Sequence, residues 1–402
     1  MQPLAGIRVL ELSRILAGPW CGQLLADLGA EVIKIERPGR GDDTRHWGPP
    51  FLADTAGAPT GESAYFLAAN RGKRSVTIDI TRPAGQDLVR RLATTSDVLI
   101  ENFKVGGLAR YGLDHAALRA ELPGLVYCSI TGFGQDGPYA HRAGYDVLIQ
   151  AMGGLMSITG EADGPPLKTG VAIADLFTGV YASTAILAAL RERDATGEGR
   201  HIDMALLDVQ VAMLANQAAN YLIGEVVPER LGNAHPNIVP YQAFATADGH
   251  LIVAAGNDDQ FRRLCAVIGR TDLAGDPAYA TNADRVANRE RLVPALAGAL
   301  ATAGTAHWVG ALEAAGVPCG PINHIDQVFA DPQVQARGLR RDLPHPLAGQ
   351  VPSVPSPIRS DGEPACADRA PPTLGADTDH VLAQCLGLDA DEIARLRADG
   401  TI

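Results

Sequence analysis

Segments with strand patterns and segments with helix patterns alternate through the first 130 residues, and this alternation restricts the fold more than any other feature of the chain. Each strand, helix and strand together take about 30 residues, the length that a right-handed crossover between parallel strands requires. The pattern predicts an α/β fold with an open, doubly wound sheet. The expected strands are 7–12, 31–36, 76–80, 98–100 and 125–130, and the expected helices are 20–28 and 83–94.

The second half of the chain predicts a smaller α+β domain at about 225–325. Asp248-Gly249 separates two apolar runs, 241–246 and 251–255, and this dipeptide is a strong signal for a β-hairpin. Helix patterns lie before and after the hairpin, and a proline-rich segment then leads to the C-terminus. The expected helices are 203–222, 259–268, 285–301, 306–315, 377–386 and 389–399, and the extended proline-rich segment is 343–372.

Loops that follow the strands are the expected ligand-binding segments, because open α/β sheets bind ligands beyond the carboxyl ends of their strands. The loop 131–137 contains Gly132-Phe133-Gly134-Gln135-Asp136-Gly137, which has the spacing G-x-G-x-x-G. We interpret it as a glycine-rich turn rather than a dinucleotide site, because Pro138-Tyr139 follows it instead of a clear helix.

Asp175 stands at the start of an apolar, alanine-rich segment that has a helix pattern up to Arg191. An acid in this position faces the positive end of the helix dipole and free backbone N–H groups. One interpretation is a helix N-cap, a position where Asp is strongly preferred. The other is a reactive carboxylate.

Composition excludes several classes of protein. The net charge of −12 argues against a nucleic-acid or membrane-surface partner, since such partners select a basic face. The six cysteines are scattered, which predicts free thiols in a reducing compartment and no metal site. No signal peptide and no apolar run of about 18 residues is evident, so we expect a cytoplasmic protein without a membrane span.

Several motifs in a fixed order resemble the family III CoA-transferases, also called the carnitine dehydratase and bile-acid-inducible operon F family. The similarity extends over essentially the whole chain. The motifs are 6–12, Ala17-Gly18-Pro19, 29–38, Asn70-Arg71-Gly72-Lys73-Arg74-Ser75, Glu101-Asn102-Phe103, Arg142-Ala143-Gly144-Tyr145-Asp146 and Ala370-Pro371-Pro372-Thr373-Leu374-Gly375.

The resemblance implies a large Rossmann-like domain built from both chain ends, 1–200 and 330–402, and a small central domain. Residues 201–224 and 326–345 are then the linkers, and two copies of the chain form an interlocked homodimer. The implied substrates are an acyl-CoA and a carboxylic acid, with no tightly bound cofactor.

The resemblance also implies that Asp175 is the nucleophile. Its carboxylate would form a mixed anhydride with the acyl group and then a thioester with CoA, so that covalent catalysis divides the exchange into easier steps. The helix N–H groups are expected to keep the carboxylate ionised. Gly170 and Gly179 are expected to allow close approach of backbone and substrate.

Residues at family positions for CoA binding are also present, although a single exposed Arg is far more often a solvated surface residue than a ligand. Thr81-Arg82 stands where the formyl-CoA branch has a lysine, which puts that contact in doubt. The implied CoA-binding residues are Arg37, Asn102, Arg110, Ile15 and Ile78.

Within the family, the chain most resembles the branch that transfers CoA from succinyl-CoA to a dicarboxylate such as glutarate. The likeness is carried by 16–19, 41–51, 218–224 and 238–244. The formyl-CoA and oxalate branch of the family has a glutamine where this chain has Leu16, and a run of glycines where it has 256–260. These departures imply that formate and oxalate are not the substrates. Arg14, Arg45 or His46 would bind the far carboxylate of the acceptor, or each is a structural loop residue.

Tyr145 is a further candidate for substrate binding, and it also bears on an alternative reaction. The racemase branch of the family has a histidine where this chain has Tyr145, and a tyrosine is a poor base near neutral pH. A 2-methylacyl-CoA racemase and a CoA-binding protein without catalysis remain the alternatives.

Overall fold

The computed structural model describes residues 2–402 and divides into two compact units. The large unit consists of Met1–Leu155, Thr169–Ala218 and Gln335–Ile402. The small unit consists of Met156–Lys168 and Ala219–Val334. Each unit has its own buried core, so each is described by itself.

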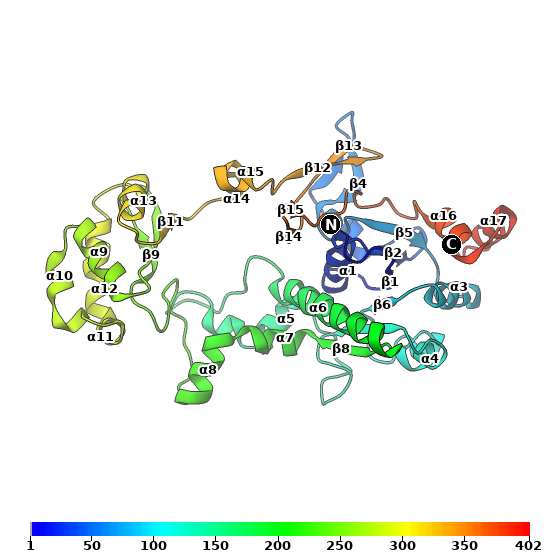
Figure 1. Ribbon diagram of the computed structural model, residues 1–402, viewed down its shortest axis with the longest axis horizontal. Coiled ribbons are helices and arrows are strands. Elements are labelled where there is room, and N and C mark those ends of the chain that lie inside the picture. Colours follow the sequence, from blue (N-terminus) through cyan, green and yellow to red (C-terminus); the bar gives the residue numbers. More distant parts are fainter. Residues whose placement is uncertain (1) are drawn as a thin grey trace. The chain divides into compact units, whose positions relative to one another are not determined.

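A six-stranded parallel sheet forms the centre of the large unit (Figure 1). The spatial order is β5-β2-β1-β6-β7-β8, so the chain runs outward from β1 to one edge and then returns to fill the other side. This order reverses direction between β1 and β6, as in dinucleotide-binding sheets. The strands are β1 (Arg8–Glu11), β2 (Glu31–Glu36), β5 (Lys73–Thr77), β6 (Val98–Glu101), β7 (Val126–Thr131) and β8 (His201–Ala205).

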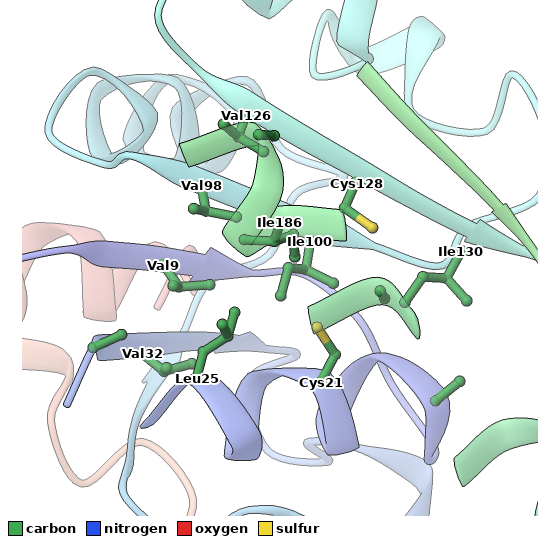
Figure 2. Close-up of a cluster of buried hydrophobic side chains, with 14 of the residues drawn as sticks. Val9, Cys21, Leu25, Val32, Val98, Ile100, Val126, Cys128, Ile130 and Ile186 are labelled. Atoms are coloured by element: carbon green, nitrogen blue, oxygen red, sulfur yellow. The ribbon is translucent and has the colours of Figure 1, made fainter. Parts of the chain in front are cut away.

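One face of the sheet is covered by α1 (Ala17–Asp27) and α6 (Ile173–Thr196), with α5 (Asp146–Met152) and α7 (Leu206–Met213) beside α6. Figure 2 shows Val9, Ile100 and Val126 of the sheet facing Leu25 and Ile186 of the helices. The strands are apolar on both faces because both are buried, which is the usual pattern for a parallel sheet.

The opposite face is covered by helices from both ends of the chain. α3 (Pro83–Thr94) and α4 (His115–Glu121) come from the first half, and α16 (Thr378–Leu386) and α17 (Ala390–Ala398) close the chain. α16 packs against β5 and α3, as Figure 1 shows in red beside blue. The central sheet is therefore parallel and covered on both faces, which confirms the predicted α/β class.

Two edge strands differ from the sequence prediction. β5 begins at Lys73, three residues before the expected start, because Lys73 is fully buried and its ammonium group bonds to Glu11 and Asn70. Residues 201–205, expected in a linker, form β8, and they pair in parallel with β7. The helix pattern that we expected from 203 begins only at Leu206.

The small unit contains a three-stranded antiparallel sheet in the order β11-β10-β9. The predicted hairpin is confirmed, since β9 (Tyr241–Ala245) and β10 (His250–Ala254) pair on either side of Asp248-Gly249. β11 (Cys319–Pro321) was not predicted. The helices of this unit are α9 (Asp258–Val267), α10 (Thr271–Gly275), α11 (Asn282–Ala287), α12 (Arg289–Leu300), α13 (Thr305–Ala314) and α14 (Ile325–Ala330).

The proline-rich segment is not simply extended, because it forms two hairpins in the large unit. Arg71 fixes the first of them by donating to Ser353 and to the Val354 carbonyl, while its other nitrogens bind Asp27. The hairpins are β12 (Arg341–His345) with β13 (Gly349–Ser353) and β14 (Arg359–Ser360) with β15 (Glu363–Pro364).

Five short elements complete the chain. They are β3 (Phe51–Ala53), β4 (Pro59–Ser63), α2 (Ala64–Ala69), α8 (Ala215–Gly224) and α15 (Pro332–Ala336).

By length and composition, α6 is apolar enough to cross a membrane, the only single helix between residues 2 and 402 for which this is so. Ala174, Ala182 and Ile186 on this helix are fully buried in the core beneath the sheet. The core position of α6 accounts for its apolar composition, since core helices of globular proteins have the same character.

Candidate active site

Asp175 lies in the first turn of α6 and is not the N-cap. The helix begins at Ile173, its N-cap is Ala172, and the Ala172 side chain offers no capping bond. The cap is supplied from elsewhere in the chain: Asp146 Oδ1 accepts from the backbone N–H of Ala174 at 2.9 Å and of Asp175 at 3.3 Å. Asp175 stands at the start of the helix, as expected, but its interpretation as the N-cap is wrong.

Asp146 reaches α6 because the loop after β7 brings the start of α5 close to the sheet. Gly132 and Gly144 touch backbone to backbone, so that a methyl group on either would lie about 2.4 Å from the other. No side chain larger than hydrogen fits there. The glycine-rich sequence 132–137 is thus a packed turn, as predicted, and α5 is the first helix to follow it.

The N–H groups at the start of α6 are occupied, and none of those described bonds to the Asp175 carboxylate. The Ile173 N–H bonds to the Val171 carbonyl at 2.9 Å, and the next two bond to Asp146. The expectation that these groups keep Asp175 ionised is wrong. Burial, together with the negative charge of Asp146, raises the pKa of Asp175 to about 7.

Tyr65 of α2 is an aromatic residue on which the charge of Asp175 acts. Burial raises the pKa of the Tyr65 hydroxyl, and the charges of Asp175, Asp146 and Asp42 raise it further. The Trp47 ring packs edge-on against Tyr65, with ring centres 5.2 Å apart. Across residues 2–402, Asp175 forms no ion pair, so its partly buried carboxylate is not neutralised by a cation of the same chain.

The two glycines near Asp175 have different roles. A Cβ on Gly179 would lie 2.8 Å from the Ala17 carbonyl oxygen and 3.0 Å from Trp20, so this glycine allows α1 to pack against α6. It serves packing rather than substrate approach, which corrects the expectation. A Cβ on Gly170 would meet nothing within 4 Å, so the segment before the helix stays open.

A cavity of about 190 Å³ lies beyond the carboxyl ends of β1, β2, β5 and β6. This is the place where a Rossmann-like sheet binds nucleotides, next to the reversal of strand order. Arg37, Ile78 and Arg110, all predicted to bind CoA, line this cavity together with Arg14. The fold thus brings three of the five predicted CoA-binding residues to one cavity.

The other two, Ile15 and Asn102, shape the loop after β1. The Asn102 side chain accepts from the Arg14 N–H at 2.9 Å and donates to the Arg14 carbonyl at 2.7 Å. Ile15 has a positive φ of 73°, and its N–H donates to Asp42. The ammonium group of buried Lys34 lies 2.9 Å from Asp42 Oδ2 and donates to the Ser13 carbonyl at 2.8 Å. These bonds to the buried strand β2 fix the position of the loop.

The four predicted acceptor-binding residues lie in different settings. Arg45 is buried and binds Glu36 and Glu62 at 2.8 and 2.9 Å, so its charge is already neutralised. Arg14 is exposed and pairs with Asp43, and His46 bonds to the Arg40 carbonyl. Tyr145 is 66% exposed, at the N-cap of α5.

Sequence reasoning missed three residues of the site. Asp146 stands in the motif Gly144-Tyr145-Asp146, in which only Tyr145 was a candidate, and its capping bond joins residues 28 positions apart. Gln150 and Tyr65 carry no sequence signal for this site. Over residues 2–402, no group of three or more His, Cys, Asp or Glu side chains is arranged to hold a metal ion.

Comparisons with known proteins show the family to which the chain belongs. The family model for CoA-transferase family III matches residues 4–378. A succinate–glutarate CoA-transferase of Agrobacterium fabrum is 56% identical over 95% of each chain, and human succinyl-CoA:glutarate CoA-transferase is 45% identical over 100% of this chain and 90% of its own. The crystal structure of a CAIB/BAIF family protein from Brucella suis has a TM-score of 0.84 and 51% identity, covering 95% of this chain and 99% of that one.

The chain therefore belongs to the family III CoA-transferases. It is an enzyme of this class, and CoA thioesters are the substrates that define the class. The curated relatives named above are CoA-transferases, and no observation favours the racemase or the non-catalytic alternative.

Proposed function

We propose that this enzyme transfers CoA from succinyl-CoA to a dicarboxylate such as glutarate, with Asp175 as the nucleophile. The observation that carries the proposal is the partly buried Asp175 carboxylate, unpaired among residues 2–402 and with its pKa raised to about 7 by burial and by Asp146. Such a carboxylate is a stronger nucleophile than one held by a cation, because less of its charge is stabilised. The names of the relatives support the choice of donor and acceptor.

The reaction begins when an Asp175 oxygen attacks the thioester carbonyl carbon of succinyl-CoA. The carbon–sulfur bond breaks, leaving a mixed anhydride and CoA thiolate. The thiolate then attacks the aspartyl carbonyl carbon, which releases succinate and forms an aspartyl-CoA thioester. The acceptor carboxylate repeats the two steps in reverse, so the thioester bond energy is conserved and no cofactor is consumed.

We propose that the nucleotide part of CoA occupies the cavity beyond β1, β2 and β5. Arg37 and Arg110 are exposed at its edge, and a guanidinium group suits a phosphate because it donates two parallel hydrogen bonds. Ile78 is 2% exposed and offers an apolar wall. Asn102 and Ile15 act by shaping the loop that carries Arg14.

Arg37→Ala and Arg110→Ala are each expected to raise the KM for succinyl-CoA about 10-fold with little change in kcat, because a hydrogen bond to a charged group contributes about 1.5–3 kcal/mol. Steady-state kinetics at saturating dicarboxylate measures both constants. Arg397→Ala is the matched control, since Arg397 is an exposed residue of α17 that pairs with Asp379. An unchanged KM in both variants would contradict the proposal that the nucleotide of CoA binds in this cavity.

For the far carboxylate of the acceptor, we propose Arg14 rather than Arg45. The Arg14 side chain is 47% exposed and has one exposed partner, Asp43, whereas Arg45 is 4% exposed between two carboxylates. A cation that is already paired twice in the core cannot turn toward a ligand without leaving both partners unpaired.

The experiment that tests the proposal mixes the purified enzyme with succinyl-CoA and a panel of dicarboxylates, without added cofactor. Glutaryl-CoA and succinate are expected in equal amounts, with ping-pong kinetics. Hydroxylamine is expected to convert Asp175 to a hydroxamate only when acyl-CoA is present, releasing CoA. Transfer to no dicarboxylate in the panel, or a hydroxamate on another residue, would contradict the proposal.

We also propose that the enzyme is an interlocked homodimer. α8 has no buried residue, and Leu222 and Ile223 are 75% and 85% exposed. On α6, Phe177, Val180 and Tyr181 are exposed within two turns of Asp175. Exposed apolar groups of this size usually mark an interface, so a second copy is expected to cover them. The molar mass in solution, measured by light scattering, tests this.

A further inference from the structure

A chain of hydrogen bonds joins the start of α6 to the interior of α5. The Asp146 carboxylate uses one oxygen for the N–H groups of Ala174 and Asp175 and the other for Gln150, whose Nε2 donates to Oδ2 at 2.6 Å. Gln150 Oε1 in turn accepts from the Thr169 N–H at 3.0 Å. Both oxygens of Asp146 are therefore held in place.

Gln150 is the fixed point of this network. Its side chain is fully buried, and a buried amide keeps one orientation because turning it would leave buried donors and acceptors without hydrogen bonds. It connects the segment just before α6, through Thr169, to the residue that caps α6. The approach segment, the cap and the first turn of α6 thus form one rigid group around Asp175.

The charges near Asp175 are unfavourable to a carboxylate. The charge of Asp146 from α5 acts on Asp175, and the charges of both aspartates act on Tyr65 from α2. Asp146 also occupies the N–H groups that would otherwise stabilise a carboxylate at a helix N-terminus. The other titratable groups on elements packed against α6 are Cys21 and Asp27 on α1, Tyr127 and Cys128 on β7, His201 and Asp203 on β8, and Asp208 on α7; Asp27 is paired with Arg71.

We infer that Asp146, locked by Gln150, is a positioning residue that keeps the Asp175 carboxylate high in free energy, so that acylation of Asp175 relieves the repulsion between the two. The inference rests on the proposed function. When Asp175 Oδ bonds to the acyl carbon, its negative charge passes to the departing CoA thiolate, and the like-charge pair disappears. In the aspartyl-CoA thioester Asp175 is also uncharged, so the repulsion from Asp146 is absent there as well.

The size of the effect follows from a simple equivalence. Protonation and acylation both remove the charge of Asp175, so the charge of Asp146 favours both by a similar factor. A neighbouring carboxylate typically contributes about one pKa unit, or a factor of about 10 in the equilibrium. Burial supplies the larger part of the shift and does not depend on Asp146.

The test compares the full-length wild type with Asp146→Asn, which keeps an oxygen for capping but removes the charge, and with Gln150→Leu, which frees Asp146 to turn. Two quantities are measured against pH. One is kcat/KM for CoA transfer. The other is the titration of the Asp175 carboxyl without substrate, from infrared difference spectra of each protein against its Asp175→Asn counterpart. Asp391→Asn is the matched control, an exposed first-turn acid of α17.

In the wild type, kcat/KM is expected to fall below a midpoint near pH 7, since the protonated carboxyl does not attack. Asp146→Asn is expected to lower this midpoint by about one unit in both measurements and to reduce the plateau of kcat/KM about 10-fold. Gln150→Leu is expected to shift the midpoint the same way by a smaller amount, and it decides the question if Asp146→Asn does not fold. Asp391→Asn is expected to match the wild type.

A midpoint that stays in place in the folded variants, whatever the loss of activity, would overturn the inference, because a purely structural role lowers activity without moving the titration of Asp175. The infrared titration separates this failure from failure of the proposed function. If the wild type transfers no CoA but the midpoint still shifts, the proposed function is wrong and the electrostatic role of Asp146 stands.

Discussion

Asp175→Asn is expected to lower kcat for CoA transfer by about 10⁴-fold or more, since loss of a covalent nucleophile removes the reaction path itself. The amide has nearly the same shape as the carboxylate, and the described backbone bonds of the first turn of α6 do not use the Asp175 side chain. The assay is formation of glutaryl-CoA from succinyl-CoA, with single-turnover measurements for slow variants.

The same variant is expected to be more stable than the wild type above pH 7. The pKa of Asp175 rises from 3.8 in the unfolded chain to about 7 in the folded protein, because burial and Asp146 disfavour the charge. The folded state therefore binds more protons between these values, and stability falls as pH rises through this window. Above pH 7 the full cost, up to about 4 kcal/mol, is present in the wild type and absent in the amide variant.

Chemical denaturation at pH 5 and pH 8 measures this difference. The gain in unfolding free energy of Asp175→Asn is expected to be larger at pH 8 than at pH 5. Asp391→Asn, with its acid exposed in the first turn of α17, serves as the control and is expected to change neither activity nor stability by much. An Asp175→Asn protein with full activity would refute the nucleophile assignment, and one that is destabilised at pH 8 would refute the electrostatic argument.

Arg45→Met is expected to lower the free energy of unfolding by about 3–5 kcal/mol, because it leaves buried carboxylates without their cation. Arg45 donates to both oxygens of Glu36 at 2.8 Å and to Glu62 at 2.9 Å. Its guanidinium also lies over the Phe66 ring, 3.6 Å from the ring centre. The methionine retains the apolar part of the side chain, so the lost charge accounts for most of the effect.

Urea denaturation of the wild type and of Arg45→Met measures the loss. Arg262→Met is the matched control, because Arg262 pairs with Asp259 where both side chains are more than half exposed, and such pairs contribute about 0–1 kcal/mol. Folded Arg45→Met is expected to keep its KM for the dicarboxylate, whereas Arg14→Met is expected to raise it. A raised KM for the dicarboxylate together with unchanged stability in Arg45→Met would indicate that Arg45 binds the acceptor.

The order of strands and helices could be predicted from the sequence because it depends on local pattern. β2 and α3 have the bounds that periodicity predicted, and the hairpin of β9 and β10 follows from the dipeptide between them. These features involve residues close in sequence. The resemblance to the family also indicated Asp175 and three residues that line the cavity beyond the strand ends, because the resemblance is read from short runs of sequence in a fixed order.

Long-range charge pairing, in contrast, was decided by the tertiary structure. Lys73 has the sequence pattern of a loop residue, yet it begins a buried strand because Glu11, 62 positions away, neutralises it. Arg45 has the pattern of a ligand for a carboxylate, yet Glu36 and Glu62 enclose it. The sequence around a charged residue does not identify its ion-pair partner, so periodicity cannot distinguish a residue of a buried ion pair from one in an exposed loop.

The site itself shows the same division. From the sequence alone, Asp175 was an acid at the start of a helix and the match to a family nucleophile. Only the fold placed Asp146 on the N–H groups of that helix, with Gln150 behind it, and so left Asp175 partly buried and beside a like charge. The reactivity of a carboxylate depends on the charges and solvent around it, and these come from segments that only tertiary packing brings together.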